Sequence, residues 1–101
     1  MEKKNNKVAL VTGGTGGMGT AICERLCKDG FTVVANYKDF TDEPKWREEA
    51  EKWKANHLKM GFDLQIVQGD IADYESAEKM FKEITDNYGQ VDVLVNNAGI
   101  T

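Results

Sequence analysis

Residues 7–28 constrain the fold of this chain more than any other segment. Lys7–Thr12 is a short apolar run of the kind that forms a strand buried on both faces. It leads into a turn that holds five glycines within residues 13–19, and Thr20–Lys28 follows with apolar residues at helical spacing up to Gly30. A buried strand, a glycine turn and a helix in this order predict the first unit of a parallel α/β sheet.

The remaining residues repeat this alternation with short connections. Further strand-length runs are Thr32–Asn36, Leu64–Val67 and Val91–Val95. Two helical patterns lie between them, one opening at Asp42 and Pro44 and ending at Gly61, the other running from a predicted N-cap at Asp73 to Gly89. The order β-α-β-α-β-α-β predicts an α/β fold, the first half of a doubly wound parallel sheet, as one continuous unit.

Composition and charge limit the functions that such a unit can have. Its 101 residues suffice for one domain, and 41% hydrophobic residues allow a modest core. A net charge of −4 and a pI near 5.0 argue against nucleic acid or an anionic membrane as partners. The apolar runs are too short to span a bilayer and the N-terminus lacks the apolar core of a signal peptide, so a cytoplasmic protein is expected.

Five chemically versatile side chains fall on helical stripes and are predicted to pack rather than react. Cys23 and Cys27 have no cysteine or histidine partners at ligand spacing, so we expect two reduced, buried thiols and no metal site. His57 is predicted to be a partly exposed packing residue, and Trp46 and Trp53 to lie in the core or at an interface rather than stack on a cofactor. The predicted buried face of the last helix consists of Tyr74, Ala77, Met80, Phe81, Ile84 and Tyr88.

The glycine turn has the chemistry of a pyrophosphate site. A pyrophosphate needs several N–H donors close together, and the start of a helix supplies unpaired N–H groups and the positive end of its dipole. Gly13 would allow a sharp turn, Gly17 a close approach of the phosphates, and Gly19 tight packing of the helix on the sheet. The Gly-Lys-Ser/Thr of a P-loop does not follow. The residues predicted to contact a dinucleotide are Gly13, Gly14, Thr15, Gly16, Gly17, Met18 and Gly19.

Two further elements follow the third and fourth strands. Asn96-Asn97-Ala98-Gly99 ends the fourth strand, and Gly69-Asp70-Ile71 ends the third. In an open parallel sheet a ligand lies across the carboxyl ends of the strands, where the strand order reverses, and strands one and four flank that point. Small residues would leave room for the cofactor, asparagine side chains bind backbone or ribose groups, and the carboxylate could accept from an adenine amino group. The additional candidate residues are Asp70, Ile71, Asn97, Ala98, Gly99 and Ile100.

The end of the second strand predicts which dinucleotide binds. NAD enzymes place an acid there for the ribose 2′-OH, whereas NADP needs that acid absent and a cation nearby. This strand ends in Asn36, Tyr37 and Lys38, and Asp39 is expected to point into the following loop. Tyr37 and Lys38 are therefore candidate cofactor-binding residues, with Lys38 near the 2′-phosphate. NADP(H) is the predicted cofactor and NAD(H) the alternative.

Together these motifs resemble the short-chain dehydrogenase/reductase family. The matching residues are Thr12-Gly13-x-x-x-Gly17-x-Gly19, Asp70-Ile71 and Asn96-Asn97-Ala98-Gly99, in the order and spacing of the family. The resemblance implies a Rossmann fold and reversible hydride transfer between NAD(P)(H) and a carbonyl. Within the family the chain is most similar to the NADPH-dependent acetoacetyl-CoA reductases of polyhydroxyalkanoate synthesis, with the 3-oxoacyl-carrier-protein reductases as the alternative. It also implies an acyl-CoA substrate and a homotetramer for the intact enzyme.

The sequence departs from the resemblance in its catalytic residues. The acid–base group of the family is a tyrosine with a lysine four residues later, helped by a serine and an asparagine. At that spacing this chain has Thr41 after Tyr37, Glu78 after Tyr74 and Asp92 after Tyr88. We therefore assign no catalytic residue and expect residues 1–101 to be the N-terminal dinucleotide-binding part of a single Rossmann domain, truncated before the catalytic region.

Two other interpretations remain open at this point. A non-catalytic half-domain could bind nucleotide or pair with another chain through the edge of the fourth strand. A methyltransferase also has a glycine-rich first loop, but the Asn-Asn-Ala-Gly element argues against one.

Overall fold

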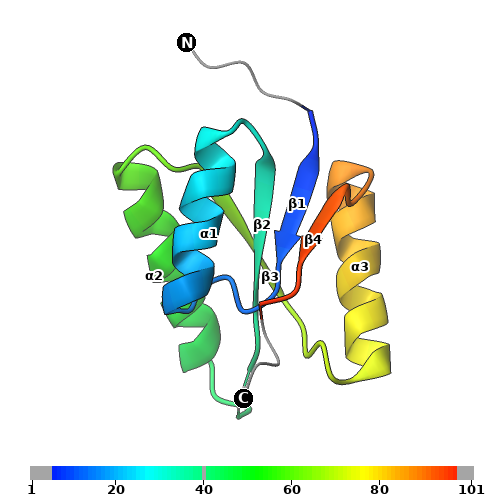
Figure 1. Ribbon diagram of the computed structural model, residues 1–101. Helices are drawn as coiled ribbons and strands as arrows, with labels where there is room; N and C mark the ends of the chain where they lie inside the picture. The colour runs from blue at the N-terminus through cyan, green and yellow to red at the C-terminus, as the bar shows by residue number, and fades with distance from the viewer. Residues whose placement is uncertain (1–5, 40, 98–101) are drawn as a thin grey trace.

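A computed structural model describes residues 6–39 and 41–97 (Figure 1). Within these residues, four parallel strands form one sheet in the order β3-β2-β1-β4. Their bounds are β1 Val8–Val11, β2 Thr32–Tyr37, β3 Leu64–Gln68 and β4 Val93–Val95. Because β1 pairs with both β2 and β4, the chain crosses from one side of β1 to the other between β3 and β4. The predicted parallel α/β fold is confirmed, with strands one and four as neighbours.

In the described part of the chain, three helices cover the two faces of the sheet. They are α1 (Gly17–Lys28), α2 (Lys45–Lys59) and α3 (Tyr74–Tyr88). α1 and α2 lie on one face and α3 lies on the other (Figure 1). Each helix is followed by the glycine predicted to end it, and all three of these glycines have a positive φ, namely Gly30 (93°), Gly61 (95°) and Gly89 (89°). Among the described residues, no helix combines the length and the apolar character that crossing a bilayer requires.

The core consists of two apolar clusters, one on each face of the sheet. On the α3 face, Met80 and Ile84 pack against Leu10, Val34 and other strand residues. On the opposite face, Cys23 of α1 packs with Val11, Val33, Ala35 and Leu64, and partly buried residues of α1 and α2 complete this cluster. All four residues of β1 are buried, so the strand that leads into the glycine turn is held rigidly from both sides.

Two element boundaries differ from the sequence prediction. α1 begins at Gly17 rather than Thr20, because the Thr20 N–H already donates to the Gly16 carbonyl at 2.7 Å. The second half of the glycine turn is therefore the first turn of the helix. β4 begins at Val93 rather than Val91, since Asp92 instead binds the start of β1, where its carboxylate accepts from the Val8 N–H at 2.8 Å.

Three side chains are not as buried or as exposed as predicted. Tyr74 is 79% exposed, because it opens α3 directly after the Asp70–Asp73 turn and only later turns carry the buried residues. Cys27 is only half-buried, whereas Cys23 is buried as expected. His57 is 6% exposed rather than partly exposed, because its ring lies between Trp53 and Phe62 and its Nε2 meets the Glu24 carboxylate of α1.

Candidate functional site

The carboxyl ends of the strands are joined by one buried side chain, that of Asn36 at the end of β2. Its Oδ1 accepts from the Gly13 N–H at 3.1 Å, and its Nδ2 donates to the Gly69 carbonyl at 2.9 Å and to the Tyr37 carbonyl at 3.2 Å. Asn36 is 3% exposed. This amide thus links the glycine turn after β1 to the residues after β3, in addition to the backbone hydrogen bonds that both segments make to the end of β2.

The glycine turn is shaped by close backbone contacts. Gly13 has a φ of 62°, which is the sharp turn predicted for it. A Cβ on Gly14 would lie 2.8 Å from the Cβ of Ala35, so this glycine lets the turn pack on β2. A Cβ on Gly19 would lie 2.8 Å from the Cα of Gly14, so α1 packs closely against the turn itself. Gly19 was predicted to let the helix pack on the sheet, but its close contact is with the turn, and Gly14 is the glycine that meets the sheet.

The start of α1 is open. The N-cap is Gly16, which has no side chain to cap the helix, and the first turn contains no acidic residue. A Cβ on Gly17 would meet no atom within 4 Å, and Met18 is 71% exposed. The N–H groups of a first helical turn and the helix dipole attract an anion, and the bare backbone here offers it an unobstructed approach.

A cavity of about 660 Å³ lies beside the turn. Its walls come from four elements, namely the glycine turn, the end of β2, one side of α2 and the residues after β3. The residues lining it are Gly13, Thr15, Gly16, Asn36, Tyr37, Lys38, Trp46, Glu49, Ala50, Trp53, Gly69, Asp70, Ile71 and Ala72. Its position at the carboxyl ends of adjacent parallel strands is where doubly wound folds bind ligands.

The predicted residues fall into three groups. Those that share the cavity are Gly13, Thr15, Gly16, Tyr37, Lys38, Asp70 and Ile71. Gly14, Gly17, Met18, Gly19 and Asn97 do not line it. The Asn97 side chain lies close by and donates to the Gly13 carbonyl at 3.3 Å, which agrees with the prediction of an asparagine that binds backbone. Ala98, Gly99 and Ile100 lie outside the described residues.

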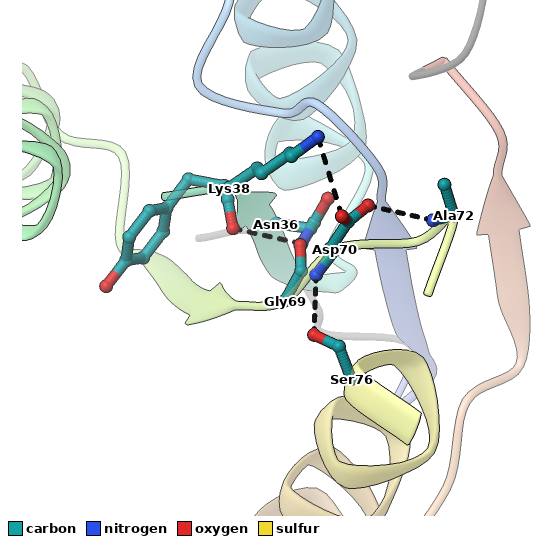
Figure 2. Close-up of polar contacts among 7 residues, drawn as sticks. Asn36, Lys38, Gly69, Asp70, Ala72 and Ser76 are labelled. Carbon is teal, nitrogen blue, oxygen red and sulfur yellow. Dashed lines mark hydrogen bonds and ion pairs between the residues drawn. The ribbon is translucent and has the colours of Figure 1, made fainter. Parts of the chain in front are cut away.

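Lys38 and Asp70 face each other across the ends of β2 and β3 (Figure 2). The Lys38 Nζ lies 3.5 Å from the Asp70 Oδ2. The other carboxylate oxygen accepts from the Ala72 N–H at 2.9 Å. The cation predicted for a 2′-phosphate and the carboxylate predicted for adenine thus form an ion pair with each other.

Tyr37 contributes a neutral phenol to the cavity. Burial, followed by the negative charge of Asp39, raises its pKa above the ordinary value. Since the proton stays on the phenol at neutral pH, Tyr37 can donate or accept a hydrogen bond there but does not act as a base.

Sequence reasoning missed two features of this site. The first is Asn36, which the sequence prediction uses only as a position without a carboxylate, although a polar residue at the end of an otherwise apolar buried strand indicates a buried hydrogen-bonding role. Trp46 and Trp53 were expected in the core or at an interface. Trp53 does pack in the core cluster and donates from Nε1 to the Thr20 hydroxyl at 3.0 Å, but both tryptophans also line the cavity.

No group of three His, Cys, Asp or Glu side chains comes together as metal ligands would within residues 6–39 and 41–97. The site is built instead from backbone N–H groups, small residues, one ion pair and aromatic rings. A parallel sheet whose glycine turn opens into a helix N-terminus at its carboxyl edge places the chain among the Rossmann-like folds.

Comparison with known proteins assigns the family. Residues 7–101 match the short chain dehydrogenase family. The chain therefore belongs to the short-chain dehydrogenase family.

Two relatives illustrate the range of similar sequences. An acetoacetyl-CoA reductase of Allochromatium vinosum is 46% identical over 95 residues, which are 94% of this chain and 37% of that protein. A 3-oxoacyl-(acyl-carrier-protein) reductase of Staphylococcus aureus is 38% identical over 98 residues, 97% of this chain and 37% of that protein. The chain thus spans little more than a third of the length of the curated relatives it matches.

Solved structures share the fold. An actinorhodin polyketide ketoreductase variant, solved with NADPH, superposes with a TM-score of 0.79 at 31% identity. The match covers 98% of this chain and 35% of the ketoreductase chain. A dehydrogenase/reductase of Sinorhizobium meliloti gives a TM-score of 0.78 at 32% identity over 97% of this chain and 36% of its own.

Proposed function

We propose that residues 1–101 form the dinucleotide-binding part of an NADP(H)-dependent reductase of 3-oxoacyl thioesters, with acetoacetyl-CoA as the expected substrate. The observation that carries the proposal is the cavity at the carboxyl ends of β1, β2 and β3, which borders the glycine turn. Membership of the short-chain dehydrogenase family supports a nicotinamide dinucleotide as its occupant.

The residues present fit such a cofactor. The open start of α1 would receive the pyrophosphate, with Gly17 leaving the space that its oxygens need. The apolar and aromatic wall beside Ile71 and Trp46 would take the adenine, and the end of β2 would meet the adenine ribose. When bound, the dinucleotide supplies the hydride for carbonyl reduction.

Lys38 supports NADP(H) over NAD(H). Neither Asn36 nor Tyr37 carries the carboxylate that would bind a ribose 2′-OH, and the Lys38 ammonium is the first charge after them. Its side chain is 44% exposed and lines the cavity, so a 2′-phosphate has access to it.

The relatives support the substrate class. One of them is named an acetoacetyl-CoA reductase and another a 3-oxoacyl-(acyl-carrier-protein) reductase, and acetoacetyl is itself a 3-oxoacyl group. Reduction of an acyl-carrier-protein thioester is the second candidate function, on the strength of the second relative. Because no tyrosine here has a lysine four residues later, we expect residues 1–101 alone to reduce no carbonyl. We also expect them to bind the cofactor weakly, since the nicotinamide half of a dinucleotide rests on the second half of such a sheet.

The test follows NADPH absorbance with the full-length protein. We expect acetoacetyl-CoA to drive oxidation of NADPH faster than of NADH, and acetoacetyl-carrier-protein to be the poorer substrate. The Lys38→Glu variant should lose about tenfold or more in kcat/KM for NADPH and little for NADH, because the 2′-phosphate would meet a like charge. No oxidation with either thioester would refute the activity, and better kinetics with NADH would refute the cofactor preference.

A further inference from the structure

The ion pair between Lys38 and Asp70 lies within the proposed cofactor cavity, because both side chains line it. Asp70 is 33% exposed and Lys38 is 44% exposed, so a ligand can reach both from solvent. Figure 2 shows the ammonium directed back at the carboxylate, from the end of β2 to the end of β3. Any anion that binds Lys38 therefore arrives beside a negative charge.

The two partners differ in freedom of movement. The Asp70 N–H donates to the Ser76 hydroxyl at 2.8 Å, while the carboxylate accepts from the Ala72 N–H at 2.9 Å. The preceding residue, Gly69, is hydrogen-bonded to β2 through both of its backbone polar groups. Its N–H donates to the Tyr37 carbonyl, and its carbonyl accepts from the Asn36 side chain. The carboxylate is held in place by these bonds, whereas the ammonium of Lys38 sits on a flexible stem that can turn.

We propose that Asp70 is a specificity-determining residue that weakens the preference for a 2′-phosphate by competing with it for Lys38. The inference rests on the proposed cofactor site. The Asp70 carboxylate and a bound 2′-phosphate would both interact with the single ammonium of Lys38. Binding of the phosphate therefore either breaks the ion pair or brings the phosphate and the carboxylate close together. A ribose with a free 2′-OH meets neither cost. Asp70 therefore reduces the difference in affinity between NADP(H) and NAD(H) that Lys38 alone would create.

The experiment compares two fragments of the cofactor on the full-length protein by calorimetry. The ratio of the Kd for 5′-AMP to the Kd for 2′,5′-ADP isolates the 2′-phosphate. In Asp70→Asn the amide oxygen can still accept from Ala72 while the competing charge is gone, so we expect this ratio to rise about two- to fivefold. Asp70→Ser, whose hydroxyl can also accept from Ala72, should raise it likewise, and Lys38→Met should lower it.

Asp73→Asn is the matched control. Asp73 is exposed, caps α3 by accepting from the Glu75 N–H, and does not line the cavity. The Asp73→Asn variant loses one negative charge close to the site, as Asp70→Asn does, and we expect its ratio of the two Kd values to stay unchanged. A ratio that is unchanged or lower in both Asp70 variants would overturn the inference and leave the cofactor site standing. If neither fragment binds any of the proteins, the proposed site is wrong and the inference with it.

Discussion

The Asn36 side chain donates to the Gly69 carbonyl at 2.9 Å and joins the end of β2 to the end of β3. The same amide accepts from the Gly13 N–H, so one side chain contacts the residues that follow β1 and β3, beside the backbone hydrogen bonds between these strand ends. Its geometry needs a donor and an acceptor on one short side chain, and the two ends of an amide supply both without a change of protonation state.

Loss of this amide should destabilise the fold. In Asn36→Ala the Gly13 N–H and the Gly69 carbonyl lose their partner, and we expect the free energy of unfolding to fall by about 2–4 kcal/mol. Chemical denaturation measures this. Asn36→Asp keeps the acceptor but loses the donor at neutral pH, and its stability should recover as acid protonates the new carboxyl. An Asn36→Ala variant as stable as the parent would contradict the role given to the amide.

Gly17 and Gly19 should respond differently to alanine. A methyl group at position 19 would press on Gly14 in the turn, so Gly19→Ala should lower the free energy of unfolding by about 1–3 kcal/mol. A methyl group at position 17 meets no atom and alanine favours the helix, so Gly17→Ala should fold with equal or greater stability while its affinity for a dinucleotide falls about tenfold or more. Thermal melts and calorimetry separate the two effects. Unimpaired binding by Gly17→Ala would show that Gly17 is not part of the proposed cofactor site.

Cys23 should make stability depend on alkaline pH. Burial is the main reason that its pKa is raised from 9.0 to about 12, and the nearby Cys27 and Glu24 add to the shift. The folded state therefore favours the neutral thiol, whose Sγ donates to the Gly14 carbonyl at 3.7 Å. Its contribution is complete below pH 9 and is lost as the pH rises toward about 12.

The Cys23→Ala variant isolates this contribution. Other groups titrate equally in both proteins, so the parent should lose stability more steeply than the variant across that alkaline range. Equal slopes would show that the thiol does not contribute.

At neutral pH a maleimide should label the half-buried Cys27 in the folded protein and leave Cys23 unmodified.

His57 should link α1 to α2. Its Nδ1 donates to the Trp53 carbonyl at 2.8 Å, and its Nε2 lies 3.1 Å from the Glu24 carboxylate of α1. His57→Ala removes both contacts and leaves a cavity beside Trp53, so we expect a loss of about 2–3 kcal/mol in unfolding free energy. Leu58→Ala, at a 58% exposed position on the same helix, is the control and should change stability by less than about 0.5 kcal/mol. Equal effects of the two substitutions would contradict the link.

Element type and order followed from local patterns. The strands, the helices and the glycines that end the helices each depend on residues that are close together in the sequence. These elements could therefore be predicted from the sequence alone. Boundaries were less well predicted where a remote partner decides them. β4 begins after Asp92, because the Val8 N–H, 84 residues away, donates to the side-chain carboxylate of Asp92 instead of to a strand carbonyl.

The candidate site shows the same division. The glycine spacing between a strand end and a helix predicted, by sequence alone, a glycine turn that leads into α1, and the structure has an open helix start there, because backbone N–H groups and missing side chains are local properties. Only the tertiary structure decided that Lys38 pairs with Asp70, that Asn36 joins three strand ends, and that Gly14 meets Ala35. These contacts connect residues far apart in the chain, and they exist because the parallel register brings the ends of β1, β2 and β3 to one edge of the sheet.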